Sequence, residues 1–323
     1  MRQGMSKETG LIGFGTPALL ALTSERERQA LLGAALDSGI THFDTAPYYG
    51  YGEAEKILGR FIKDRRDEVT ITTKFGIQPP RLAGGGSVAG AVKRLVKNLG
   101  PVRKLLARQA GKMVQRAAFG ADDAAKSLEA SLRALQTEHI DIYLLHEAGP
   151  SDTSDELLAF LEEKKKQGII GRFGTGSDFR KVLAMATARK TFADVLQFEN
   201  SVVRPNLRSL AGVKGGVLTI THGALSGSFR ELNDALQTDV ALRRSCSEVL
   251  AVDAGDSRHL AAAMLLWAAH DNPQGMVLFS SSRMANLRAN MEVWGESRFT
   301  SEQLEQFARL VAAGLPLNEG IHP

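Results

Sequence analysis

The sequence predicts an α/β fold, a single (β/α)8 TIM barrel with long loops at the C-terminal face of its strands. Strand-like runs alternate with amphipathic helical stretches from end to end, which is typical of a parallel sheet. Eight such strand-like runs occur in 323 residues, and this number favours a closed barrel. An open nucleotide-binding sheet normally has a three-glycine fingerprint after its first strand, and Gly13–Ala18 lacks the third glycine.

The expected strands are short and rich in apolar or β-branched residues. In order they are Leu11–Gly15, Thr41–Asp44, Val69–Lys74, Ile140–His146, Arg172–Thr175, Asp194–Phe198, Gly216–Ile220 and Met276–Phe279. The fourth, with the sequence IDIYLLH, is nearly all apolar, as expected of a strand buried on both faces.

The expected helices follow from apolar residues at helical spacing. We expect Ser24 and Glu27 to form a capping box for a first helix that ends at Asp37. Further helices are expected at Glu53–Lys63, Asp155–Gln167, Asp178–Arg189, Ser257–His270, Met284–Val293 and Ser301–Ala313.

Two connections are long, Gly76–Gly120 and His222–Asp256. Connections above about 15 residues are usually functional lids or disordered segments. Both follow the C-terminal ends of strands, where barrel active sites lie. No linker or short repeat divides the chain, so we expect residues 1–323 to form one domain, with a basic insertion at about 77–120 after the third strand.

Composition is ordinary for a globular protein, with 43% hydrophobic and 24% charged residues. No apolar run is long enough to cross a bilayer, and the N-terminal MRQGMSKETG lacks the apolar stretch of a secretory signal. The single cysteine, Cys246, cannot form an intrachain disulfide and fits a reducing compartment. We therefore expect a cytoplasmic protein without integral membrane association.

Positive charge is concentrated in one segment. Nine Lys or Arg and no Asp or Glu lie between Phe75 and Ala121, so the net charge of +4 leaves −5 for the rest of the chain. Apolar residues at helical spacing between Val92 and Leu106 favour two amphipathic helices with solvated basic faces. The alternatives are a lid over the substrate pocket and a site for a membrane surface or an acidic partner. Nucleic-acid binding is least favoured, because the segment has few aromatic residues and matches no known nucleic-acid-binding motif.

Three polar clusters stand at expected strand ends: FDTAPYYG (Phe43–Gly50), TTKFG (Thr72–Gly76) and IDIYLLHE (Ile140–Glu147). The C-terminal ends of barrel strands meet at one mouth, so these clusters are expected to converge there.

The ionisable residues of the clusters suit proton transfer to a carbonyl oxygen. A free tyrosine has a pKa of about 10, and a nearby Lys74 is expected to lower the pKa of Tyr49. Asp44 would keep Lys74 charged and in place, while a neutral His146 would orient the substrate oxygen or share the proton. Each residue alone has a structural alternative, such as a helix cap or a core histidine. Their joint placement favours catalysis.

In this order the clusters resemble the signature of the aldo-keto reductase family, and the resemblance covers nearly the whole chain. The family places an aspartate five residues before a tyrosine that a glycine follows, as Asp44, Tyr49 and Gly50 do. Lys74 and His146 resemble the family's catalytic lysine and histidine. The neighbouring Tyr48 does not fit the spacing, and we expect it in the pocket wall.

The resemblance also implies residues that bind a nicotinamide cofactor. Gln197 and Ser177 match positions that hold the carboxamide, although the family's Ser-Asn pair has no clean counterpart and could be Gly176-Ser177 or Ser177-Asp178. His222 stands where the family often has an aromatic residue that stacks on the nicotinamide, and Leu225 is also expected to bind the cofactor.

The segment LFSSSRMANLRAN resembles the family's adenosine-phosphate site. Asn290 matches an adenine-contacting asparagine and Ser281 a phosphate-contacting serine. The lysine and arginine that usually hold the 2′-phosphate are Ser280 and Asn286 here, so Arg283 is the nearby candidate to replace them. NADP(H) is therefore favoured over NAD(H).

The resemblance implies an NADP(H)-dependent oxidoreductase that reduces an aldehyde or ketone by direct hydride transfer, with Tyr49 as general acid. The substrate would be a small carbonyl compound or a sugar. One alternative is an NAD(P)-dependent aldose dehydrogenase, because some long-loop bacterial members resemble this KFG-containing sequence. Another is a non-catalytic barrel that binds NADP(H) as a redox sensor. We expect no metal, because the histidines are scattered and Cys246 is alone. The sequence leaves the oligomeric state open.

Overall fold

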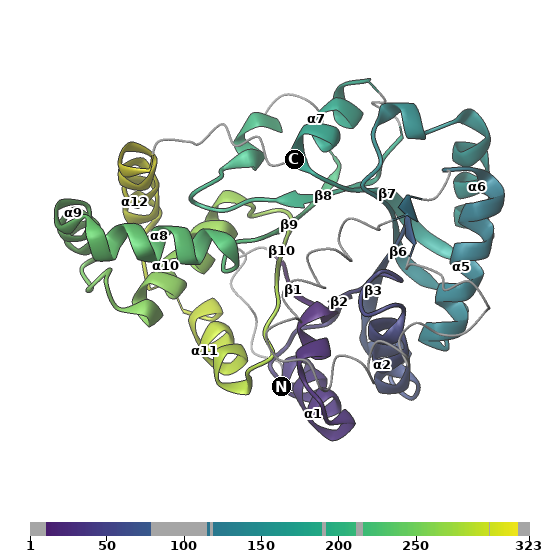
Figure 1. The fold of residues 1–323 in the computed structure, drawn as a ribbon, viewed down its shortest axis with the longest axis horizontal. Helices are drawn as coiled ribbons and strands as arrows, with labels where there is room; N and C mark the ends of the chain where they lie inside the picture. The colour runs from purple at the N-terminus through teal and green to yellow at the C-terminus, as the bar shows by residue number, and fades with distance from the viewer. Residues whose placement is uncertain are drawn as a thin grey trace.

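The computed structural model describes residues 11–78, 115–116, 119–188, 192–210, 216–296 and 298–315. At its centre is a closed barrel of parallel strands in the order β1-β10-β9-β8-β7-β6-β3-β2 (Figure 1). The strands are β1 (Leu11–Gly15), β2 (His42–Asp44), β3 (Thr70–Phe75), β6 (Ile140–His146), β7 (Ile170–Gly176), β8 (Val195–Glu199), β9 (Leu218–His222) and β10 (Met276–Phe279). The predicted fold class is confirmed, and every predicted strand end lies within two residues of its observed position.

Helices surround the barrel (Figure 1). None of the described helices has both the length and the apolar character that a membrane span requires. The α-helices are α1 (Glu25–Asp37), α2 (Glu53–Ile62), α5 (Ala121–Leu135), α6 (Asp155–Lys166), α7 (Phe179–Ala188), α8 (Gly227–Thr238), α9 (Val240–Leu250), α10 (Ser257–Asp271), α11 (Met284–Trp294) and α12 (Ser301–Gly314).

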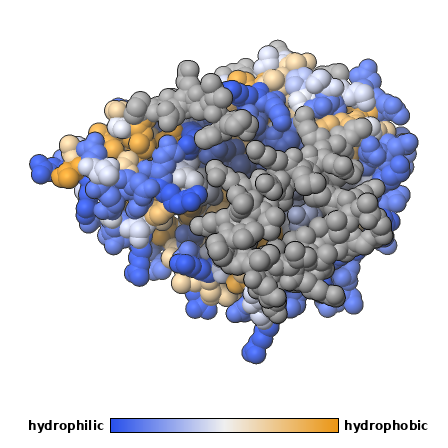
Figure 2. Space-filling view, viewed as in Figure 1, coloured by the Kyte–Doolittle hydropathy of each residue, from blue (hydrophilic) through white to orange (hydrophobic). Residues whose placement is uncertain are grey.

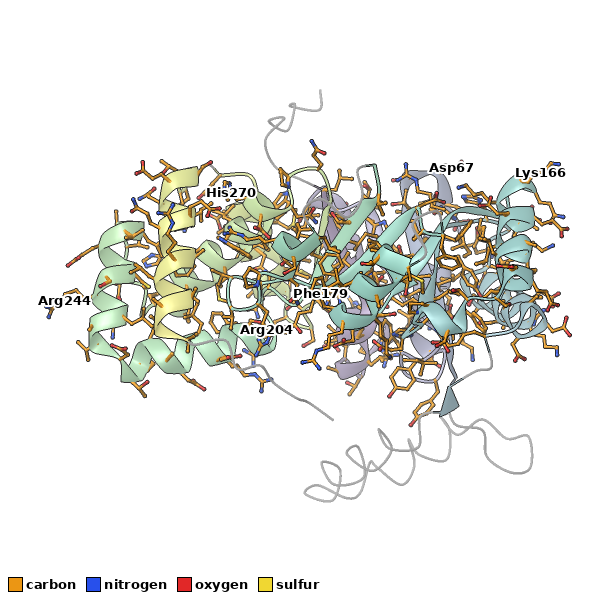
Figure 3. All side chains as sticks on the ribbon, turned by 90° about the horizontal axis from the view of Figure 1, so that it is seen from above. Asp67, Lys166, Phe179, Arg204, Arg244 and His270 are labelled. Atoms are coloured by element: carbon orange, nitrogen blue, oxygen red, sulfur yellow. The ribbon has the colours of Figure 1, made fainter. Side chains whose placement is uncertain are left out.

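The two ends of the barrel are distinct (Figure 3). Phe179 and Arg204, which follow strands, lie at one end, whereas Asp67, Lys166 and His270, which precede strands, lie at the other. At the first end, β4 (Ile77–Gln78) and β5 (Gln115–Arg116) pair as a separate two-stranded antiparallel sheet. The central part of the basic segment, residues 79–114, lies outside the described residues, as do the two helices expected there.

Two sequence-based expectations about local structure were wrong. Ser24 is the N-cap residue of α1, but its side chain makes no capping hydrogen bond, so there is no capping box with Glu27. The connection from His222 to Asp256 is not a long loop, because it contains α8 and α9. Both helices bury residues at four-residue spacing: Leu232 and Leu236 in α8, and Leu242, Cys246 and Leu250 in α9.

Side chains alternate between the barrel interior and the surrounding helices. The interior holds its own apolar cluster, separate from the layer between strands and helices: Ile142, Leu144, Val195, Ile220, Met276 and Leu278. Further along the same strands, two-residue steps place His146, Gln197, His222 and Ser280 on the inward face nearer the C-terminal end. The two-residue period of the strands therefore places polar side chains at the C-terminal end of the barrel and apolar side chains below them. The polar side chains form the site.

Gly174 shows how closely two strands approach. A Cβ atom at this residue of β7 would lie 1.8 Å from the carbonyl oxygen of Val195 on β8. We expect Gly174→Ala to lower the free energy of unfolding in urea by about 1–3 kcal/mol, because the strands must separate. Gly33→Ala in α1 is the control, because nothing lies within 4 Å of its Cβ position and alanine favours helix. Equal stability of the two variants would contradict this account of the β7–β8 contact.

Candidate active site

A cavity of about 1440 Å³ opens at the C-terminal end of the barrel. Asp44, Tyr49, Lys74 and His146 all line it, although they come from three separate parts of the chain. Hydrophilic residues dominate the described part of this face of the molecule (Figure 2). The structure therefore brings together the four residues that the sequence assigned to catalysis.

The cavity floor is a buried, charged network. Lys74 is 3% exposed, and its Nζ donates to Asp44 Oδ1 at 2.6 Å and to the carbonyl oxygen of Thr45 at 3.0 Å. Gln197, also 3% exposed, donates from Nε2 to Asp44 Oδ2 at 2.7 Å. Both oxygens of the Asp44 carboxylate thus accept hydrogen bonds, which compensates for their loss of solvent.

Tyr49 and His146 stand beside this network. Lys74 Nζ donates to Tyr49 Oη at 3.4 Å, and the rings of Tyr49 and His146 lie edge to face with their centroids 6.3 Å apart. The turn that follows Tyr49 requires glycine at Gly50, where φ is +60° and a Cβ atom would lie 2.6 Å from the Leu20 side chain. The phenol oxygen thus lies within hydrogen-bond distance of the Lys74 ammonium group.

Burial controls the proton affinity of Tyr49. Loss of solvation raises the pKa of Tyr49 above its ordinary value, and the attraction of the Lys74 ammonium only partly offsets this effect. The expectation that Lys74 makes this phenol more acidic than a free tyrosine was therefore wrong. At neutral pH the Tyr49 hydroxyl is protonated and can donate.

The neighbouring groups have fixed charges. Burial alone would lower the pKa of Lys74, but the Asp44 carboxylate and the hydrogen bonds to Asp44 and Tyr49 raise it above its ordinary value. Burial lowers the pKa of His146 to about 3, and Lys74 adds to this effect. The site therefore combines a cationic lysine with a neutral imidazole, as the sequence predicted.

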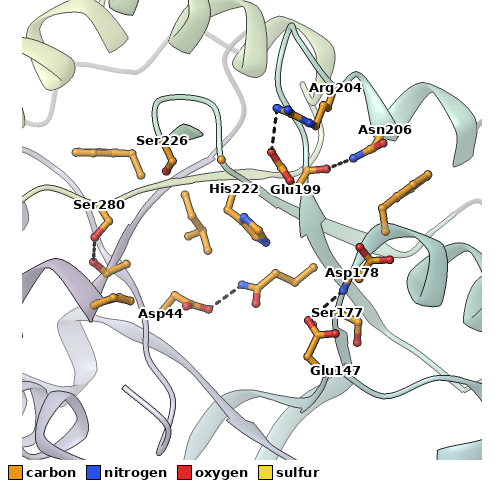
Figure 4. A pocket seen from close by; sticks show the side chains of 18 of the residues that line it. Asp44, Glu147, Ser177, Asp178, Glu199, Arg204, Asn206, His222, Ser226 and Ser280 are labelled. Atoms are coloured by element: carbon orange, nitrogen blue, oxygen red, sulfur yellow. Dashed lines mark hydrogen bonds and ion pairs between the residues drawn. The ribbon is translucent and has the colours of Figure 1, made fainter. Parts of the chain in front are cut away.

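Four of the residues assigned to cofactor binding line the same cavity: Ser177, Gln197, His222 and Leu225. Figure 4 shows the His222 ring directed into the pocket. The Ser177 Oγ contacts the Ala148 carbonyl oxygen at 3.1 Å. The backbone N–H of Ser177 donates to the Gln197 carbonyl oxygen at 3.1 Å, so these two carboxamide candidates are neighbours.

The remaining assigned residues lie beyond the cavity lining. Ser281, Arg283 and Asn290 are not among the described lining residues, although Ser280 is. Ser281 Oγ accepts a hydrogen bond from the backbone N–H of Arg283 at the start of α11, and the Arg283 side chain is exposed. The expectation that Tyr48 forms part of the pocket wall was wrong, because it does not belong to the described lining, whereas the inward position is taken by Tyr49.

Several polar residues of the cavity wall were not predicted from the sequence. Glu147 and Asp178 lie beside the predicted His146 and Ser177, and Glu199 and Arg204 form an ion pair at 3.8 Å (Figure 4). The inward-facing period of β8, which continues from Gln197 to Glu199, is a signal that could have identified Glu199. Within the described residues, no group of three or more His, Cys, Asp or Glu could hold a metal ion.

The chain is similar to known oxidoreductases. It is 25% identical over 243 residues to the aldo-keto reductase yakc [NADP(+)] of Schizosaccharomyces pombe. That match covers 71% of this chain and 63% of the relative, so it spans less than two thirds of the relative's length.

Solved structures share the fold. An aldo-keto reductase of Bacillus halodurans in its holo form has a TM-score of 0.69 and 22% identity, covering 94% of this chain and 92% of that one. An aldo-keto reductase of Klebsiella pneumoniae in complex with NADPH has a TM-score of 0.65 and 20% identity, covering 98% of each chain. The sequence model of the aldo/keto reductase family matches residues 11–312, and the chain therefore belongs to this family.

Proposed function

We propose that this protein is an NADP(H)-dependent oxidoreductase that reduces an aldehyde or ketone to an alcohol, with Tyr49 as the general acid. The observation that carries the proposal is the buried Lys74, which donates both to Asp44 and to Tyr49 at the floor of a large cavity. We place the enzyme in the cytoplasm, which the single buried cysteine, Cys246, supports.

The cavity fits a nicotinamide cofactor. Gln197 uses its Nε2 to donate to Asp44, and no described residue donates to its Oε1, so this oxygen can accept from a carboxamide NH2. His222 lines the same cavity from the neighbouring strand β9, where its imidazole can stack on the nicotinamide, and Ser177 lies beside Gln197. When bound, the reduced nicotinamide supplies a hydride to the carbonyl carbon.

The residues of the chain handle the proton. As negative charge develops on the carbonyl oxygen, the Tyr49 phenol donates its proton to that oxygen. The Lys74 ammonium stabilises the phenolate that remains, and Asp44 keeps Lys74 in place. His146, neutral because its pKa is about 3, can hydrogen-bond the same oxygen without adding charge.

We propose NADP(H) over NAD(H), with Ser281, Arg283 and Asn290 at the adenosine end. Arg283 is exposed at the start of α11, where a guanidinium can form a fork with a 2′-phosphate. The NADP(+) in the name of the Schizosaccharomyces pombe relative and the NADPH complex of the Klebsiella pneumoniae protein support this preference.

Initial rates test the proposal. The purified protein should oxidise NADPH in the presence of 4-nitrobenzaldehyde. It should oxidise NADH more slowly under the same conditions. Faster turnover of NAD⁺ with aldoses would instead identify an aldose dehydrogenase. Tight NADPH binding without turnover of any tested carbonyl compound or sugar would identify a sensor and contradict the proposal.

The pH dependence follows from the protonation states. Reduction needs a protonated phenol, and because the pKa of Tyr49 is raised above its ordinary value of about 10, kcat for reduction should be nearly constant from about pH 6 to pH 9. Oxidation of the alcohol needs the phenolate, so its rate should rise with pH over the same range. The rates are measured by NADPH absorbance. If kcat for reduction instead falls with a midpoint between pH 7 and pH 8, a group other than Tyr49 is the proton donor.

A further inference from the structure

We propose that the ion pair of Glu147 and Lys181 is a positioning device that locks the loop after β6 to the start of α7, and so holds His146 and Ser177 in their places. This inference rests on the proposed function. Neither residue is predicted to contact the reacting atoms. They act through His146, which precedes Glu147, and through Ser177, which lies just before α7.

The backbone of Glu147 is the first observation. It directly follows His146 and has a φ of +62°, in the left-handed region that residues other than glycine seldom adopt. Such conformations cost of order 1–3 kcal/mol and persist where the surroundings impose them. The backbone N–H of Glu147 donates to the Gly176 carbonyl oxygen at 3.0 Å, which directs the chain from β6 toward the end of β7.

The side chain of Glu147 makes the second link. Its Oε1 accepts from the backbone N–H of Asp178 at 3.1 Å, immediately after Ser177 (Figure 4). A carboxylate at the start of α7 also interacts favourably with the helix dipole. Glu147, next to His146, therefore fixes the backbone of Asp178, which is next to Ser177.

Lys181, on α7, contacts Glu147 at two points. Its Nζ donates to the Glu147 carbonyl oxygen at 3.1 Å and to Glu147 Oε2 at 2.8 Å. One ammonium group thus fixes both the strained backbone and the carboxylate. The burial of His146 is the main cause of its lowered pKa, and the charges of Lys74 and Lys181 also lower it, so Lys181 is close enough to help keep the imidazole neutral.

A second ion pair provides a matched control. Lys165 and Asp194 lie 2.6 Å apart with side chains 35% and 35% exposed, whereas Lys181 and Glu147 lie 2.8 Å apart with side chains 37% and 34% exposed. The control pair joins α6 to the start of β8, at the opposite end of the barrel from the cavity. Lys181→Met and Lys165→Met therefore remove the same charge from equally exposed pairs, and only one of them lies at the site.

The experiment compares the two variants by NADPH fluorescence titration, steady-state kinetics and thermal unfolding. Lys181→Met should weaken NADPH binding and lower kcat for aldehyde reduction by about 10-fold each, because small displacements at a reacting centre have large effects on rate. Lys165→Met should leave both values within about 2-fold of wild type. Lys181→Arg, which restores the charge, should recover most of the loss.

Two further results complete the test. The double variant Glu147→Gln/Lys181→Met should be no worse than Lys181→Met alone, because coupled residues lose one shared interaction. Equal binding and kcat for Lys181→Met and Lys165→Met would overturn the inference, as would a larger loss in the double variant than in Lys181→Met. If wild type binds NADPH but reduces no carbonyl compound, the proposed function fails, while the binding arm still decides whether this pair positions Ser177.

Discussion

Tyr49→Phe is expected to lower kcat for aldehyde reduction by about 10³-fold, because it removes the proton donor and little else. Oη of Tyr49 contacts the Lys74 ammonium at 3.4 Å and lines the cavity. The phenyl ring retains the shape of the phenol, so the NADPH dissociation constant and the melting temperature should change little.

The neighbouring tyrosine is the control for this change. Tyr48 has the same side chain and is also half-buried, but it is not among the described residues of the cavity lining. Tyr48→Phe should retain nearly full activity in the same NADPH absorbance assay. Similar losses in both variants would mean that the Tyr49 hydroxyl is not the specific proton donor.

Asp44→Asn is expected to cost both stability and activity, since it leaves a buried ammonium group without its counter-charge. The side chains of Lys74 and Asp44 are 3% and 6% exposed, and removal of one partner of such a pair costs about 3–5 kcal/mol in urea unfolding. The raised pKa of Lys74 contributes stability that is fully present at neutral pH and is lost only as pH rises through that pKa. In the variant, burial would favour neutral Lys74, so kcat should also fall steeply.

An exposed carboxylate provides the comparison. Glu129 pairs with Arg133 at 3.5 Å, with side chains 68% and 71% exposed. Glu129→Gln should therefore leave the urea midpoint and kcat unchanged. If Asp44→Asn loses no more stability in urea than Glu129→Gln, the view that Asp44 compensates a buried charge is contradicted.

The barrel and the four catalytic candidates were predictable because strand period and strand ends determine both. Alternation along β6 and β8 fixes which side chains face inward, and this pattern is visible in the sequence. The C-terminal ends of parallel strands meet at one mouth, so Asp44, Lys74 and His146 could be brought together without knowledge of any distance.

Other features depended on information that the sequence does not contain. The pKa of Tyr49 reflects a balance between burial and the Lys74 charge, and the extent of burial is known only once the helices and loops are in place. The helices α8 and α9 occupy one crossover, so the repeat of one strand and one helix gave no reason to expect both. Glu147 and Lys181 meet only because β6 and β7 are neighbours in the barrel.

The fate of the cofactor's C4 hydrogen tests the central claim most directly. Wild type, given NADPH deuterated at both C4 positions and 4-nitrobenzaldehyde, should form an alcohol with one deuterium on its carbinol carbon, and Tyr49→Phe should form almost none in the same time. Mass spectrometry of the product measures both. An alcohol whose carbinol hydrogen comes from solvent, or equal deuterium transfer by the two proteins, would contradict the account.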